Sequence, residues 1–243
     1  MKEIKPEEFT KEYNEKEFEI ELKYDGTQAQ VFWDGGKLTI LTKAGIDRTE
    51  RFNHIALEME KVCREKLPEN AETLIVGEIV KFGENEKCVF PFKKEDFGLT
   101  KLIAFDIKIK GDYSVRRAEL KRLFGGCSHI EVAHRYESFK DGWADVLYNG
   151  YEGLVAKLKD ASFQLDYGIK MKNLEDKDIV IVNYEENKLN NTITAIGQGG
   201  ERTVIYDQEA IGQVKARLGR IAITIENLTG TKRFPKFKKI VEG

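Results

Sequence analysis

The sequence predicts an α+β fold in two domains, with a larger domain of sheets and helices over residues 1–175 and a small β-barrel over 176–243. In the first part, several runs alternate apolar and polar residues, which is typical of half-buried strands. Another run there repeats apolar residues at spacings of three and four, which indicates an amphipathic helix. From Asp178 onward, short β-branched runs are separated by Asn- and Gly-rich turns at roughly ten-residue spacing, and this pattern favours a barrel.

The composition is that of an ordinary globular protein. The 243 residues carry a formal net charge of −2, with 34% charged and 41% hydrophobic side chains, so any basic surface has to be local. The three cysteines are widely spaced, which argues against a disulfide framework and a Cys-x-x-Cys zinc site. The N-terminus lacks an apolar signal core, and no run approaches the roughly 18 apolar residues of a membrane span, so we expect a soluble intracellular protein.

The run from Phe18 to Tyr24 is expected to be a strand that carries a candidate nucleophile, Lys23, into a tight turn. Its even-numbered residues are apolar, so Glu21 and Lys23 share the opposite face. A hairpin signal follows and a further strand covers 37–43, which places Lys23 on a rigid meander. The charged residues 1–16 have no clear period, and we expect them to fold back over the sheet without a chemical role.

The remaining elements are predicted by the same rules. A helix runs from Phe52 to a stop near Pro68, and another covers 115–124, with Ser114 as its N-cap and a glycine pair as its stop. Strands are expected over 74–80, 102–109, 153–158 and 169–172, helices over 140–150 and 208–218, and barrel strands over 179–182, 192–196, 202–206 and 221–225.

Several short motifs follow one another along the chain. They are Lys23-Tyr24-Asp25-Gly26, Ile75 to Val80, Ile103 to Ile107, Tyr151 to Lys157, Ile169 to Lys172 and Arg233-Phe234-Pro235-Lys236-Phe237. In this order the set resembles the covalent nucleotidyltransferases, and the last motif resembles the segment that closes the OB domain of ATP-dependent DNA ligases. The resemblance implies a nucleotidyltransferase (adenylation) domain with antiparallel sheets and flanking helices, followed by a small OB-fold β-barrel.

The resemblance implies a lysyl-AMP intermediate. Lys23 would attack the α-phosphate of ATP and expel pyrophosphate, a step that requires a deprotonated lysine. Lys170 and Lys172 would contact the α-phosphate and stabilise the charge that gathers on its oxygens. Arg233 would contact the leaving pyrophosphate.

The resemblance also assigns side chains that bind the nucleotide. Glu21 would contact the adenine amino group, which favours ATP over GTP, and Phe105 would stack on the base. Glu78 would bind the ribose, and Lys157 would face the triphosphate. Glu152 would support Mg²⁺ near the phosphates, because this ion prefers hard oxygen ligands.

Two positions depart from the ligase pattern. Gln28 stands where the pattern has an arginine. The neutral glutamine cannot make the charge-assisted contact of that arginine, and the loss of such a contact costs roughly 1.5–3 kcal/mol. Lys43 stands at another position that is usually arginine, where it keeps the charge that binds the nucleotide but loses the bidentate fork. These departures bear on efficiency and on the choice of substrate.

The first functional hypothesis is an ATP-dependent DNA ligase that acts as a monomer on nicked duplex DNA. Residues 200–243 carry nine Lys and Arg against five Asp and Glu, a charge that suits a nucleic-acid backbone. An RNA ligase with the same chemistry is the alternative, which Gln28 keeps open. A capping guanylyltransferase is disfavoured by Glu21 and the C-terminal motif, and an OB-type binding module without activity does not explain the upstream motifs.

Overall fold

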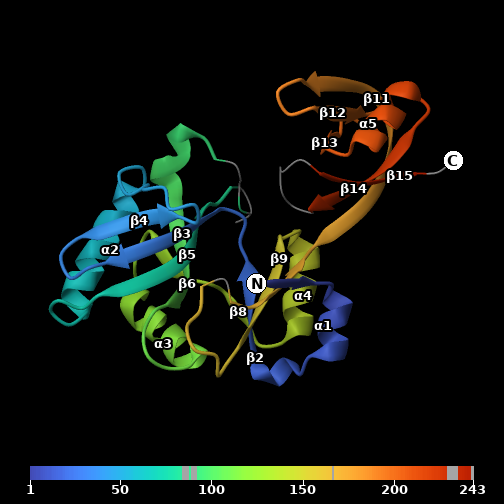
Figure 1. Cartoon of the computed structure of the whole chain (residues 1–243). Helices are drawn as coiled ribbons and strands as arrows, with labels where there is room; N and C mark the ends of the chain where they lie inside the picture. The colour runs from blue at the N-terminus through green and yellow to red at the C-terminus, as the bar shows by residue number, and fades with distance from the viewer. Residues whose placement is uncertain (84–87, 89–91, 166, 229–234, 242–243) are drawn as a thin grey trace. The chain divides into compact units, whose positions relative to one another are not determined.

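The computed structural model describes residues 1–83, 88, 92–165, 167–228 and 235–241. These residues divide into two compact units, Met1–Lys172 and Asn173–Gly243, which are coloured from blue to yellow and from orange to red in Figure 1. Within the described ranges, every helix is too short or too polar to cross a membrane.

The first unit contains two five-stranded sheets. One has the order β1-β10-β9-β2-β8 and the other β4-β3-β5-β6-β7. The strands of the first sheet are β1 (Lys2–Ile4), β10 (Ile169–Lys172), β9 (Gly153–Leu158), β2 (Phe18–Lys23) and β8 (Arg135–Tyr136). Those of the second are β4 (Leu38–Thr42), β3 (Thr27–Trp33), β5 (Thr73–Lys81), β6 (Thr100–Ile107) and β7 (Ile130–Val132). Pairing is antiparallel except between β1 and β10 and between β6 and β7.

The first sheet has one apolar face and one polar face. The apolar residues of β2, β9 and β10 pack with two helices, α1 (Pro6–Glu12) and α4 (Phe139–Asn149), into one buried cluster. Ser138 caps α4 by accepting a hydrogen bond from the backbone N–H of Asp141, and Gly150 ends the helix in the left-handed conformation. Because side chains alternate along a strand, the charged residues of β2 lie on the other face.

Two further helices pack against the second sheet and form a hydrophobic core with it. Along α2 (Asn53–Lys66), the buried residues Ile55, Met59 and Val62 recur at spacings of three and four, as the sequence predicts. The helix α3 (Tyr113–Phe124) buries Leu120 and Leu123 in the same cluster. The short 3-10 helices η1 (Glu15–Glu17) and η3 (Lys94–Leu99) complete the unit.

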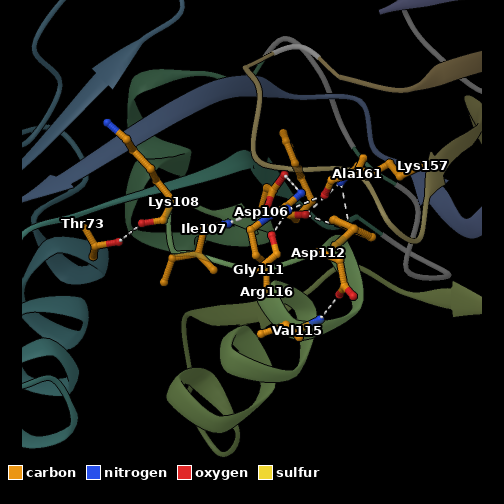
Figure 2. Close-up of polar contacts among 12 residues, drawn as sticks. Thr73, Asp106, Ile107, Lys108, Gly111, Asp112, Val115, Arg116, Lys157 and Ala161 are labelled. Carbon is orange, nitrogen blue, oxygen red and sulfur yellow. Dashed lines mark hydrogen bonds and ion pairs between the residues drawn. The ribbon is translucent and has the colours of Figure 1, made fainter.

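One sequence-based expectation for this unit was wrong. The N-cap of α3 is Asp112 and not Ser114, because the Asp112 carboxylate accepts the backbone N–H of Val115 at 2.9 Å (Figure 2). Residues 1–16 pack against the first sheet, as expected, and they also contain regular structure that the sequence did not indicate: Ile4 and Phe9 are buried, and they anchor β1 and α1 in the first core. The short strands β7 and β8 had no sequence signal.

The described residues of the second unit form five strands and one helix. The strands are β11 (Leu174–Asn187), β12 (Thr192–Gly197), β13 (Arg202–Ile205), β14 (Ala222–Leu228) and β15 (Lys236–Val241), and the helix is α5 (Gln208–Ala216). The pairing order β11-β12-β13-β15-β14 returns to β11, and a single register pair, Val204 with Lys236, joins β13 to β15. Isoleucines of four strands and one side of α5 form the core. The sequence did not indicate strand β15, because the lysines of this segment suit contact with a nucleic-acid backbone as well as a strand.

A buried ion pair fixes α3 to β6. Arg116, which is fully buried, donates from Nε to Asp106 Oδ1 at 2.7 Å and from Nη1 to the carbonyls of Gly111 (3.0 Å) and Ala161 (2.7 Å), as Figure 2 shows. One side chain therefore connects a helix, a strand and the segment after β9. An arginine in this position satisfies several buried acceptors at once.

We predict that Arg116→Met lowers the free energy of unfolding by roughly 3–5 kcal/mol, because it leaves the Asp106 carboxylate buried without its partner. The matched control is Arg122→Met, which removes an arginine of the same helix from a partly exposed pair with Glu119 and has an expected effect of about 0–1 kcal/mol. Urea unfolding followed by circular dichroism measures both. Equal losses in the two variants would contradict the prediction.

Candidate active site

The polar face of the first sheet brings three of the predicted lysines together. Lys23 of β2 lies opposite Gly153 of β9, and Gly153 lies opposite Lys172 of β10. Directly opposite residues share a face, so the side chains of Lys23 and Lys172 project from the same side, with their Cα atoms roughly 10 Å apart. Lys170, two residues before Lys172 on β10, projects from this face as well.

Two motif glycines allow the close backbone contacts of the site. A Cβ atom on Gly153 would lie 2.0 Å from the carbonyl oxygen of Met171, and its φ of +147° disfavours other residues. Gly153 therefore leaves the space between Lys23 and Lys172 without a side chain. A Cβ atom on Gly26 would lie 2.2 Å from the carbonyl oxygen of Ile79, so the turn after Lys23 is pressed against β5 of the second sheet.

Lys23 pairs with the motif acid that precedes β9. The distance from Lys23 Nζ to Glu152 Oε1 is 2.7 Å, and the Glu152 side chain is only 3% exposed. Its second oxygen, Oε2, is buried and has no hydrogen-bond partner among the described residues. This orphaned carboxylate oxygen fits a hard cation. The described part of the chain contains no group of three His, Cys, Asp or Glu side chains that could hold a metal ion, so other ligands would have to complete such a site.

Glu21 lies at the centre of a buried polar network. Its Oε2 accepts from Lys157 Nζ at 3.0 Å, and its Oε1 accepts from Arg117 and, at 2.5 Å, from the hydroxyl of Tyr113. Burial, and then the nearby Glu21 carboxylate, raise the pKa of Tyr113 well above its usual value, so the hydroxyl keeps its proton. If Glu21 also accepts from an adenine amino group, it has to share its oxygens with these donors.

Phe105 of β6 lies next to this network. Its carbonyl oxygen accepts from Lys157 Nζ at 2.8 Å, and the same ammonium lies 4.6 Å from the centre of the Phe105 ring. The ring itself is only partly buried. The structure therefore brings Glu21, Lys157 and Phe105 together, and the three residues link the two sheets.

A single carboxylate bridges the two lysines of β10. Oε2 of Glu3 lies 3.0 Å from Nζ of Lys170 and 3.0 Å from Nζ of Lys172. Glu3 reaches them because β1 pairs with β10 in parallel and sets Glu3 opposite Lys170. The two lysines together lower the pKa of the Glu3 carboxyl despite its partial burial, so Glu3 is ionised at neutral pH.

Two further predicted residues, Glu78 and Lys43, lie on or next to strands of the second sheet. Glu78 of β5 lies opposite Gln28 of β3. Lys43 follows β4 in a tight turn, which the backbone N–H of Gly45 closes with a hydrogen bond to the carbonyl of Thr42 at 2.8 Å. Arg233 lies outside the described residues.

Sequence reasoning missed three residues of this site, namely Tyr113, Arg117 and Glu3. The signal for the first two was the buried face of α3, where a tyrosine and an arginine occupy positions that a purely structural helix fills with apolar residues. Glu3 carried no signal, since a three-residue strand is too short to show a period.

Comparisons with known proteins identify the family of this chain. The family model described as ATP dependent DNA ligase domain matches residues 2–174. A DNA ligase of Thermococcus fumicolans is 27% identical over 198 residues, which is 68% of this chain and 34% of that protein. The chain thus spans about a third of the length of this curated relative.

Solved structures share the fold. A Lig E DNA ligase, described in a study of DNA binding with a minimal scaffold, has a TM-score of 0.64 at 18% identity, with 96% of this chain and 95% of that chain covered. A mycobacterial DNA ligase D complexed with ATP has a TM-score of 0.55 at 14% identity, with coverages of 92% and 89%. The family match covers most of the chain and includes Lys23, Glu152, Lys170 and Lys172, and the chain therefore belongs to the ATP-dependent DNA ligase domain family.

Proposed function

We propose that this protein is an ATP-dependent polynucleotide ligase that seals nicks in duplex DNA. The observation that carries the proposal is the arrangement of Lys23, Glu152 and Lys172 around Gly153 on one sheet face. This arrangement presents one amine beside a carboxylate and a second cation nearby, which are the groups that lysine attack on a phosphate requires. Membership of the ligase domain family supports the same conclusion.

In the first step, the neutral amine of Lys23 attacks the α-phosphorus of ATP. A nitrogen–phosphorus bond forms, the bond to pyrophosphate breaks, and the lysine loses a proton. Glu152 Oε1, at 2.7 Å, is placed to receive that proton. AMP then passes from Lys23 to the 5′-phosphate at the nick, and the adjacent 3′-hydroxyl attacks this phosphate and displaces AMP.

The nucleotide would lie between the two sheets of the first unit. Phe105 would stack on the base, with Lys157 and Glu21 behind it, and Glu78 would bind the ribose. Lys170 and Lys172 would hold the α-phosphate, and Lys43 would add a further positive charge. The ATP named in the description of the mycobacterial ligase D structure supports ATP as the nucleotide.

Mg²⁺ would bind at Glu152 with the phosphates of the nucleotide. The buried and unpartnered Oε2 of Glu152 is the protein ligand that the structure offers. When bound, the ion neutralises phosphate charge that would otherwise oppose attack.

The division into domains and the substrate are also proposals. We propose an adenylation domain over residues 1–175 and an OB-fold domain over 176–243, in which Arg233 contacts the leaving pyrophosphate. The Lig E structure, whose description names DNA binding with a minimal scaffold, supports DNA as the partner. We propose that the protein binds nicked duplex DNA as a monomer. An RNA ligase remains the second candidate, because Gln28 replaces the arginine of the ligase pattern.

We predict that Lys23→Ala abolishes covalent labelling of the protein by α-labelled ATP, because the variant has lost the attacking nitrogen. Lys37→Ala, which removes an exposed lysine from the β3–β4 hairpin, should label like the wild type. Label is read on denatured protein and then chased onto nicked DNA or onto an RNA nick. Label that persists in Lys23→Ala would contradict the mechanism. Transfer of the label to RNA alone would favour the RNA ligase.

Glu152→Gln should raise the Mg²⁺ concentration for half-maximal labelling by at least about tenfold, which corresponds to about 1.4 kcal/mol. Glu65→Gln, on the exposed side of α2, is the control and should leave this concentration unchanged. A titration of the labelling rate with Mg²⁺ measures both variants. If Glu152 acts only by pairing with Lys23, the rate falls equally at every Mg²⁺ concentration, and the metal role is wrong.

Gln28→Arg should raise kcat/KM for sealing nicked DNA by about tenfold, because it restores a charge-assisted contact worth roughly 1.5 kcal/mol or more. Gln30→Arg adds the same charge two residues further along β3, and we expect a smaller effect. Steady-state sealing assays at several DNA concentrations measure the difference. A decrease for Gln28→Arg would mean that the new arginine pairs with Glu78 instead, and would contradict the prediction.

A further inference from the structure

The N-terminal strand places an acid at the cationic end of the site. Glu3 uses one oxygen, Oε2, to accept from both Lys170 and Lys172 at 3.0 Å. One anionic oxygen held between two ammonium groups is also the arrangement in which these lysines would hold an oxygen of the α-phosphate. The carboxylate and the phosphate therefore compete for the same two cations.

The position of Glu3 fits such a competitor. Strand β1 has three residues and lies at the edge of the sheet, where β10 is its one partner among the described strands. Ile4 is 8% exposed and belongs to the core, so the backbone of the strand is anchored, whereas the Glu3 side chain is 40% exposed. A change of the Glu3 rotamer can free both lysines without moving the strand.

We infer that Glu3 occupies the α-phosphate position of the resting site and that it weakens nucleotide binding until its side chain swings away. The inference rests on the proposed function, since it assigns the α-phosphate to Lys170 and Lys172. Glu3 would thus set the affinity for the phosphates of ATP while leaving the contacts of the base unchanged.

The test measures ATP and adenosine binding by calorimetry in a Lys23→Ala background, in which no covalent product forms. Glu3→Gln should tighten ATP binding roughly two- to fivefold, the size expected of a charge pair at a partly exposed position, and should leave adenosine binding unchanged. Glu8→Gln removes the same charge from the exposed side of α1 and should change neither. Glu3→Asp keeps the charge and should bind ATP less tightly than Glu3→Gln.

Unchanged or weaker ATP binding in Glu3→Gln overturns the inference, and so does an equal change for adenosine. Covalent labelling by α-labelled ATP is measured in parallel on the proteins that retain Lys23. This measurement distinguishes a wrong role for Glu3 from a wrong proposed function. If the wild type takes no label but Glu3→Gln still tightens ATP binding, the ligase proposal fails and the competition stands. If the wild type is labelled and the affinity for ATP does not rise, only the role of Glu3 is wrong.

Discussion

The site depends on the buried carboxylate of Glu21. Three donors converge on it, namely Lys157 from the neighbouring strand and Arg117 and Tyr113 from α3. A buried carboxylate is stable only with such partners, and removing one of them leaves charge uncompensated. Because β2 and β9 belong to the first sheet and α3 packs against the second, this network joins the two halves of the unit. It also sets the position of Phe105, whose carbonyl shares Lys157 and Tyr113 with the carboxylate.

Most of the side chains that meet at the candidate site lie in short motifs that the sequence singles out, on or next to strands with clear alternation. Lys23 and Glu21 share a face for this reason, and the same holds for Lys170 and Lys172. The alternation of apolar and polar residues along one strand does not reveal its register with a strand that is distant in the chain. The pairing of Lys23 with Glu152 therefore became visible only in the structure, as did the row formed by Lys23, Gly153 and Lys172.

Other features escaped prediction for different physical reasons. Strand β1 is held by one buried isoleucine and by its pairing with β10, so its three residues carry too little pattern to identify it. Strand β15 is rich in lysine and is kept in the barrel by its pairing with β14. At the start of α3, two polar residues could serve as the N-cap, and backbone geometry selected Asp112 over Ser114.

The row formed by Lys23, Gly153 and Lys172 also has a consequence for how the protein folds. Strand β2 comes from the start of the unit, and its partner β9 and the next strand β10 come from its end. Contacts of such high sequence separation form slowly, because the chain loses much entropy before they stabilise it. A ribosome-bound chain in which β9 and β10 are still unmade would hold Lys23 without the strands that carry Gly153 and Lys172. Lys23 would thus gain these chemical surroundings only when the whole unit has been synthesised and has folded.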